Sequence, residues 1–196
     1  IEEETQLPID KVFARFQDKP TAAASIAQVH HGTLLDGSDV IIKVQRPDIR
    51  EQIETDINIL TTIAQLMDKH IPESRFFNPT GIVKEFSRTV RKELDFSEEA
   101  KNCLRFRKNF ENSPHIYIPK TYSEFSTEKI LIMERIEGVR IDDISAIEGM
   151  GLDRKELAKN GVDAYFKMVL EDGFFHADPH PGNIFAMSEG QIGFMD

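Results

Sequence analysis

A segment near the end of the chain, residues 176–183, combines residue types that could handle a phosphoryl group. Asp178 and Asn183 are five positions apart, which is the spacing of the acid and the amide in the catalytic loop of kinases. Phosphoryl transfer needs a carboxylate that orients or deprotonates the acceptor, together with an oxygen ligand for Mg²⁺. The segment therefore predicts a phosphoryl-transfer loop in which Asp178 is the catalytic carboxylate.

Two other interpretations of this loop stay open. Asp178 and Asn183 could cap backbone groups of a turn, because Asp and Asn side chains commonly do so and two prolines and a glycine lie among these residues. His176, Asp178 and His180 could instead bind a transition metal. The loop alone favours the kinase interpretation without excluding the other two.

The last residue, Asp196, ends a strand-like segment thirteen positions after Asn183. In kinase-like sites, an aspartate at the end of the strand that follows the catalytic loop binds Mg²⁺ and opens the D-F-G motif. We therefore expect Asp196 to be a metal ligand, and its spacing from the loop strengthens the kinase interpretation.

A lysine at the end of a β-branched run could contact the nucleotide. Residues 40–43 read Val-Ile-Ile-Lys and fit the kinase pattern V-A-I-K, whose lysine meets the α- and β-phosphates. An ordinary exposed strand lysine is the alternative, but a hairpin precedes Lys43 and a helix pair follows it. The acidic partner should come from a helix expected over residues 80–110, where Glu93, Asp95 and Glu99 are the candidates. Asp95 and Glu99 would share one face of that helix.

The stretch Ala22-Ala23-Ala24-Ser25 stands where an ordinary protein kinase has a glycine-rich phosphate loop. Alanine is small, but its methyl group removes the easy access to positive φ that glycine has, so this loop should be stiffer. Ser25 and backbone N–H groups could still contact phosphate. Close packing of small residues is the alternative, and it is compatible with the nucleotide-binding role.

Glu134 stands at the end of another expected strand, where the chain would pass between two lobes. Backbone groups at this place would be available to an adenine ring. We therefore include Glu134 among the candidate cofactor-binding residues.

The apolar pattern predicts an α+β chain. Apolar residues three and four apart indicate helices, and β-branched runs beside turn signals indicate strands. A β-rich N-lobe with inserted helices would span residues 1–135, and residues 136–196 would begin a mainly helical C-lobe. The expected helices cover residues 5–18, 48–70, 80–110 and 153–172, and the expected strands cover 39–45, 117–122, 129–134, 184–187 and 191–195.

Composition restricts the classes of partner. The 196 residues carry a net charge of −10, which argues against general binding of nucleic acid. A single cysteine, Cys103, rules out an internal disulfide. No apolar run approaches the roughly 18 residues of a membrane span, and no signal peptide opens the sequence. We expect a cytoplasmic protein, and the chain reads as part of a longer one.

Taken together, these segments resemble the UbiB family of atypical kinase-like proteins, also described as aarF-domain kinases. The alanine-rich stretch followed by Gln-Val-His is the most specific of them, whereas aminoglycoside and choline kinases carry loops similar to the last one. The resemblance extends over nearly the whole chain and rests on residues 20–30, 40–47, 93–96 and 176–183.

The resemblance implies a bilobal protein-kinase-like fold that binds ATP or ADP with Mg²⁺ between its lobes. It also implies a role for each matching residue. Lys43 matches the nucleotide lysine and Glu99 the helix acid that pairs with it. Asp178 matches the catalytic acid of the loop. Asn183 and Asp196 match metal ligands.

Family members are associated with an ATPase activity that supports ubiquinone biosynthesis. In them, the acids of an E-x-D motif, matched here by Glu93 and Asp95, engage an upstream K-x-G-Q segment, which this sequence lacks. The resemblance also implies lipid or quinone-pathway partners and a location peripheral to the inner membrane through segments outside this sequence. The alternatives are a small-molecule kinase of the aminoglycoside or choline kinase type and a nucleotide-binding scaffold without catalysis.

Overall fold

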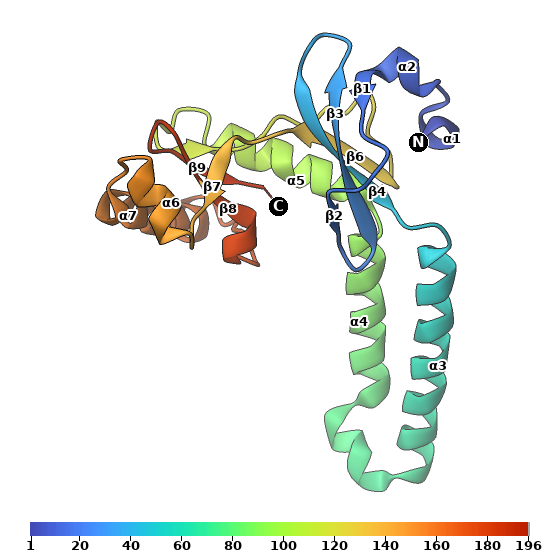
Figure 1. Ribbon diagram of the computed structural model, residues 1–196. Coiled ribbons are helices and arrows are strands. Elements are labelled where there is room, and N and C mark those ends of the chain that lie inside the picture. Colours follow the sequence, from blue (N-terminus) through green and yellow to red (C-terminus); the bar gives the residue numbers. More distant parts are fainter. Residues whose placement is uncertain (196) are drawn as a thin grey trace.

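The computed structural model describes residues 1–195, with all side chains among them except that of Arg75. Two sheets make up the body of the fold, and a long helical hairpin projects from the first of them (Figure 1). The α+β class expected from the sequence is confirmed.

The first sheet is antiparallel, in the order β1-β3-β4-β6, with β2 paired to another part of β3. The expected helix over residues 5–18 was wrong in its second half, because residues 13–16 form a strand that pairs with β3. Aromatic residues at both ends of this strand suit a half-buried sheet edge. The elements of this part are α1 (Glu2–Thr5), α2 (Ile9–Val12), β1 (Phe13–Phe16), β2 (Ala22–Ala23), β3 (Ala27–Leu34), β4 (Asp39–Gln45) and β6 (Ile130–Glu134).

Strand β4 has two differently used faces, because successive side chains of a strand point to opposite sides. Val40 and Ile42 are fully buried in one apolar cluster with residues of β1, β3 and β6. Ile41 packs on the other face, in a cluster that includes Phe96 and Ala100 of helix α5. Lys43 is two positions after Ile41 and therefore lies on the same face of β4, the one that α5 covers.

The helical hairpin consists of α3 (Ile49–His70) and α4 (Pro79–Glu93), joined by a 3₁₀ turn (Pro72–Phe77). Arg91 of α4 donates from Nε and a terminal nitrogen to the two carboxylate oxygens of Glu54 on α3, at 2.7 and 2.8 Å. Large apolar side chains remain exposed along the pair and at its tip, where Phe76 is 88% exposed. No helix within residues 1–195 is long and apolar enough to cross a bilayer.

The continuous helix expected over residues 80–110 was wrong, because the chain breaks between α4 and α5 (Phe96–Asn109). Asp95 has extended backbone angles and is the N-cap of α5, where its Oδ1 accepts the N–H of Ser97 at 2.9 Å. An aspartate in this position satisfies an N–H group that the helix itself cannot bond. The preceding Leu94 is buried and anchors the corner.

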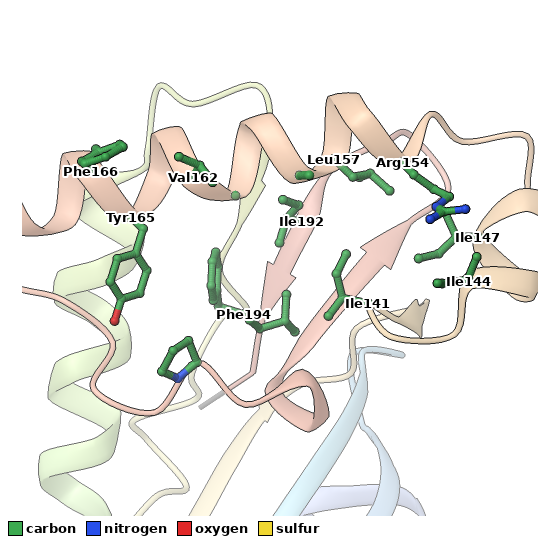
Figure 2. A pocket seen from close by; sticks show the side chains of 14 residues that line it. Ile141, Ile144, Ile147, Arg154, Leu157, Val162, Tyr165, Phe166, Ile192 and Phe194 are labelled. Atoms are coloured by element: carbon green, nitrogen blue, oxygen red, sulfur yellow. The ribbon is translucent and has the colours of Figure 1, made fainter.

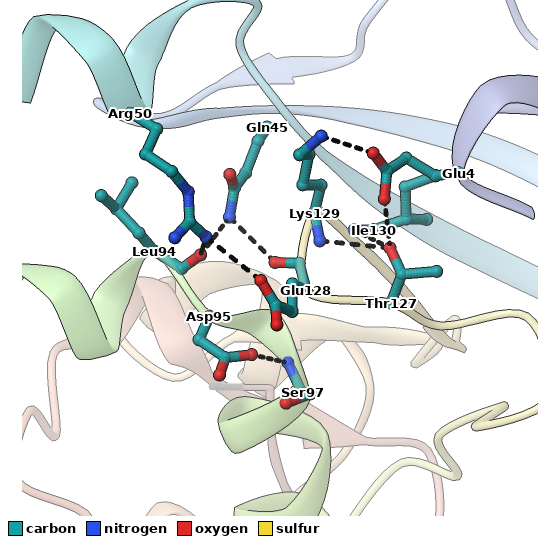
Figure 3. A network of polar contacts seen from close by, with 10 residues as sticks. All are labelled: Glu4, Gln45, Arg50, Leu94, Asp95, Ser97, Thr127, Glu128, Lys129 and Ile130. Atoms are coloured by element: carbon teal, nitrogen blue, oxygen red, sulfur yellow. Dashed lines mark hydrogen bonds and ion pairs between the residues drawn. The ribbon is translucent and has the colours of Figure 1, made fainter.

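A hydrogen-bond network ties this corner to the end of β4 (Figure 3). The buried Gln45 donates from Nε2 to the carbonyl oxygens of Leu94, at 2.7 Å, and Glu128, at 3.0 Å. Arg50 also donates to the Leu94 carbonyl, at 3.1 Å, and the N–H of Phe96 donates to the Glu128 carbonyl. The first turn of α5 is therefore fixed against β4 and the segment that leads into β6.

The second sheet has the order β5-β9-β8-β7, with β5 and β9 parallel and the other pairs antiparallel. The expected helix over 153–172 continues from α7 into a π-helical turn. A division into lobes near residue 135 stays a prediction, and β5 joins the second sheet although it precedes that position. The elements are β5 (Ile116–Tyr117), β7 (Gly138–Arg140), α6 (Ile144–Gly149), α7 (Arg154–Phe166), the π-helical turn Lys167–Glu171, the 3₁₀ turn Pro181–Asn183, β8 (Ile184–Met187) and β9 (Ile192–Phe194).

The Gln45 network predicts a measurable contribution to stability. Gln45→Leu keeps the side-chain volume but removes one buried and one partly buried hydrogen bond, and each carbonyl retains one other donor. We expect the free energy of unfolding of the full-length protein to fall by about 1–2 kcal/mol, measured by urea denaturation. Gln52→Leu, at an exposed position of α3, is the matched control and should change it by less than about 0.5 kcal/mol. Equal losses in both variants would contradict the assignment.

Candidate functional site

An ion pair between β4 and α5 is the first element of the site. Lys43 Nζ lies 2.6 Å from Glu99 Oε1, and the two side chains are 16% and 24% exposed. Lys43 is held by the register of β4 between β3 and β6, and Glu99 lies in the first turn of α5. Partial burial lowers the local dielectric, so the carboxylate holds the ammonium more firmly than it would in water. Among the three acids considered from the sequence, Glu99 is the one in this contact.

The other two acids lie elsewhere. Glu93 is the exposed last residue of α4, and Asp95 is the N-cap of α5. The expectation that Asp95 and Glu99 share one face of a continuous helix was wrong, because the helix breaks at Asp95 itself. A regulatory role for Glu93 and Asp95 stays a prediction.

The alanine-rich stretch forms a tight hairpin next to Lys43. Ala22 pairs with Val29 across β2 and β3, and Val29 pairs with Lys43 across β3 and β4. The turn between β2 and β3 is closed by the N–H of Ala24, which donates to the carbonyl of Ala27 at 2.9 Å. Ala22, Ala23, Ala24 and Ser25 are all exposed.

Every residue of the alanine turn has a negative φ, because none from 21 to 27 is among the positive-φ positions of the chain. The alanine methyl groups are therefore compatible with the conformation of the turn, which does not use the left-handed region that favours glycine. The structure thus places a small-residue loop, built without glycine, one strand away from the lysine.

The loop of residues 176–183 is shaped by its own histidines. The Nδ1 atom of His176 accepts the N–H of Asp178 at 3.2 Å, and Nδ1 of His180 accepts the N–H of Gly182 at 3.0 Å. The hydroxyl of Tyr165, which points from α7 toward this loop, donates to the His176 carbonyl at 2.9 Å (Figure 2). Asp178 is exposed, so its carboxylate is available to a ligand.

The transition-metal interpretation gains no support from this geometry. Within residues 1–195, no group of three or more His, Cys, Asp or Glu side chains could hold a metal ion. The oxygen donors of Asp178 and Asn183 are instead of the hard type that Mg²⁺ prefers. Asp196 lies outside the described residues, so its role as a metal ligand stays a prediction, as does that of Asn183.

The chain at the end of the second sheet contacts the elements that carry Lys43 and Glu99. The N–H of Met195 donates to the carbonyl of Asn183 at 2.9 Å. Met195 in turn packs against the cluster that contains Ile41 of β4 and Phe96 and Ala100 of α5. These contacts connect the predicted catalytic loop, residues 176–183, to the elements that carry Lys43 and Glu99.

The side chain of Glu134 connects the two sheets. Its carboxylate accepts hydrogen bonds from the Tyr117 hydroxyl of β5 and from the N–H of Lys120, and Arg107 lies 4.0 Å away. Burial, together with the Glu134 hydrogen bond, raises the pKa of Tyr117 to about 12. The Glu134 carboxylate is thus engaged by the protein, and any contact with adenine would fall to the backbone, as the sequence interpretation supposed.

An apolar pocket lies away from these residues. It has a volume of about 660 Å³, and its wall is mainly apolar, formed by α6, α7 and the second sheet (Figure 2). Lys43, Glu99, Asp178 and Asn183 do not line it. Pro179 is its one contribution from the catalytic-loop segment. The pocket is therefore an exposed part of the apolar core around Leu157 and Phe194 rather than the predicted nucleotide site.

Two residues that support the site were missed from the sequence. Gln45 fixes the corner before α5, and Arg46 contacts the alanine turn through its backbone and its guanidinium. Gln45 is the last residue of the lysine strand and Arg46 directly follows it, so a polar pair at the end of that strand was the signal. Their acceptors are backbone carbonyls of segments far away in the sequence, which a sequence pattern does not reveal.

Comparisons with known proteins identify the family of this chain. The whole chain, residues 1–196, matches the family described as the ABC1 atypical kinase-like domain. A Vibrio cholerae protein named "Probable protein kinase UbiB" is 44% identical over 186 residues, which are 94% of this chain and 34% of that protein. A protein of the same name from Aeromonas salmonicida is 43% identical over 190 residues, which are 96% of this chain and 35% of that protein.

A solved structure supports the fold. The complex of Rv3197 with erythromycin, from Mycobacterium tuberculosis, matches with a TM-score of 0.81 and 28% identity, over 98% of this chain and 48% of that chain. The present chain spans about a third of the length of the curated relatives. The kinase-like fold and the resemblance to the UbiB family expected from the sequence are both confirmed, and the chain belongs to the ABC1 atypical kinase-like family.

Proposed function

We propose that this chain is the nucleotide-binding and phosphoryl-transfer part of an atypical kinase or ATPase that uses ATP with Mg²⁺. The observation that supports this most directly is the Lys43–Glu99 ion pair, with the alanine turn one strand away. A lysine held by a helix carboxylate beside a small-residue hairpin is the arrangement that kinases use for the α- and β-phosphates.

Each part of the site has a chemical task in this proposal. Glu99 holds the Lys43 ammonium in place, so that it can meet phosphate oxygens without a large loss of side-chain freedom. Asp178 orients or deprotonates the acceptor, which is water if the activity is ATP hydrolysis. Asn183 and Asp196 would hold Mg²⁺, which when bound neutralises the charge of the phosphates. In this proposal the side chains are held in position to stabilise the charge on the phosphates, and none of them forms a covalent bond with the phosphoryl group.

The biological role proposed is support of ubiquinone biosynthesis. It rests on the UbiB name of relatives that share 42–44% identity with this chain. Lipids or quinone-pathway proteins are the proposed partners besides the nucleotide, and the net charge of −10 disfavours nucleic acid. A cytoplasmic location beside the inner membrane belongs to the same proposal.

Two other functions would use the same residues differently. A small-molecule kinase of the aminoglycoside or choline kinase type would release ADP only when a hydroxylated acceptor is added. A scaffold would bind ATP and never turn it over. Catalysis is favoured over a scaffold because each of these kinase motif positions carries a residue type that catalysis needs: Lys43, Glu99, Asp178 and Asn183. The UbiB relatives favour the first proposal over the small-molecule kinase.

Lys43→Met tests the nucleotide site. The variant removes a charged hydrogen-bond donor worth about 1.5–3 kcal/mol, so kcat/KM for ATP hydrolysis by the full-length protein should fall about 10- to 100-fold. Lys101→Met is the matched control, because Lys101 is an exposed lysine of α5 paired with Glu98. Unchanged kinetics in Lys43→Met would show that this lysine does not contact the nucleotide.

Asp178→Asn separates catalysis from binding. Loss of the carboxylate should lower kcat at least about 100-fold, whereas ATP affinity, measured by calorimetry, should change less than about threefold. Asp163→Asn, at an exposed position of α7, is the control for the loss of one negative charge. Full turnover by Asp178→Asn would show that another group acts on the acceptor. ATP binding without turnover by the unmodified protein would establish the scaffold.

Ala24→Gly tests the stiffness of the alanine turn. Glycine at a position with negative φ adds about 0.4–1 kcal/mol of chain entropy, which corresponds to about two- to fivefold in an equilibrium. We expect the ratio of ATP to ADP affinity to shift by this factor, measured by calorimetry. Ala14→Gly, at an exposed position of β1, should leave the ratio unchanged. The same ratio in Ala24→Gly as in the unmodified protein would argue against a stiff loop.

A further inference from the structure

Arg46 holds the alanine turn from two sides. A terminal guanidinium nitrogen of Arg46 donates to the carbonyl of Ala24 at 3.0 Å, and its backbone N–H donates to the carbonyl of Ile26, also at 3.0 Å. These two carbonyls flank Ser25 at the tip of the turn. Within residues 1–195 no carboxylate forms an ion pair with this guanidinium. The Arg46 guanidinium therefore bonds to the backbone of the turn, at the Ala24 carbonyl.

The position of Arg46 is itself restricted. Arg46 directly follows β4, and Gln45 before it is buried and bonded to the α4–α5 corner. Pro47 follows, and a residue before proline is confined to extended backbone conformations because the proline ring clashes with the helical one. The backbone of Arg46 is thus restricted by its neighbours, independently of the contact between its side chain and the turn.

The contact with Ala24 determines the orientation of one peptide group. A trans peptide directs its C=O and N–H in opposite directions. Because the Ala24 carbonyl points at the guanidinium, the N–H of Ser25 in the same peptide points away from it. In the part of the chain that the structure describes, neither the Ser25 nor the Ile26 N–H donates a hydrogen bond. Successive N–H groups of a turn that are directed outward can bind an anionic group.

We propose that Arg46 is a positioning residue for the nucleotide: it fixes the Ala24–Ser25 peptide so that the Ser25 N–H faces a phosphate of ATP. This inference rests on the proposed nucleotide site. It assigns to Arg46 a role carried through the loop rather than direct contact with the nucleotide. The stiffness of the turn then comes from this clamp as well as from its alanines.

The first test uses the full-length protein without nucleotide. Hydrogen exchange of a peptide that covers residues 21–28 should be about tenfold faster in Arg46→Met than in the unmodified protein, because the turn loses one of its two hydrogen bonds to Arg46. Arg15→Met is the matched control, since Arg15 is an exposed arginine of β1 in the same sheet, and its exchange in this peptide should be unchanged. Arg46→Lys should fall between the two, because a flexible ammonium can reach the same carbonyl.

The second test measures ATP hydrolysis. In Arg46→Met the KM for ATP should rise about tenfold while kcat changes less than about threefold, because the loop binds phosphate alike in the ground state and the transition state. A higher KM with unchanged hydrogen exchange would mean that Arg46 contacts phosphate directly, which overturns the proposal. Unchanged exchange and unchanged KM would overturn it as well.

The outcomes separate this inference from the proposed function. If the unmodified protein neither binds nor hydrolyses ATP, the proposed function fails, and the exchange comparison still shows whether Arg46 holds the turn. If Arg46→Met does not fold, Arg46→Lys carries both tests, with an intermediate increase in exchange as the supporting result and no increase as the contrary one.

Discussion

The arrangement depends on the contact between Lys43 and Glu99, because both charged groups are partly buried and neither can be left without a counter-charge at low cost. The contact requires that β4 and α5, which are separated by more than fifty residues in the sequence, meet with a fixed offset. Lys43 is set by the sheet register. Glu99 is set by where α5 begins, so the start of that helix is the critical position in this half of the molecule.

Hydrogen bonds between side chains and backbone groups fix the position of that start. Asp95 caps α5, and Gln45 holds the carbonyl of the preceding Leu94. Gln45 lies two residues after Lys43 and therefore on the same face of β4. One strand face thus carries both the lysine that meets the helix acid and the amide that sets the position of the helix. The next residue, Arg46, extends the same strand end to the alanine turn.

The segment that carries Asp178 and Asn183 is connected to the first sheet and α5 through a small number of contacts. Glu134 and Tyr117 connect the two sheets, and the Met195 N–H connects the Asn183 segment to the cluster under α5. These ties lie at the ends of strands, where the chain passes from one sheet to the other. The apolar pocket between the second sheet and α7 belongs to the packing of these elements, and Lys43, Glu99 and Asp178 do not line it.

The sequence by itself predicted which residue types could do the chemistry and several of the local elements that carry them. The lysine strand, the alanine-rich stretch and the Asp178–Asn183 spacing are local patterns. The helix break at Asp95 was not predicted, because the apolar periodicity of residues 80–110 continues across it. The tertiary structure alone decided that Glu99, rather than Asp95, meets Lys43, and that residues 13–16 pair as a strand. It also decided the contacts of Gln45 and Arg46. The reason is that a sequence pattern records propensity and periodicity, whereas the carbonyl oxygens that these side chains bond carry no signature in residue identity and are placed only when distant segments pack together.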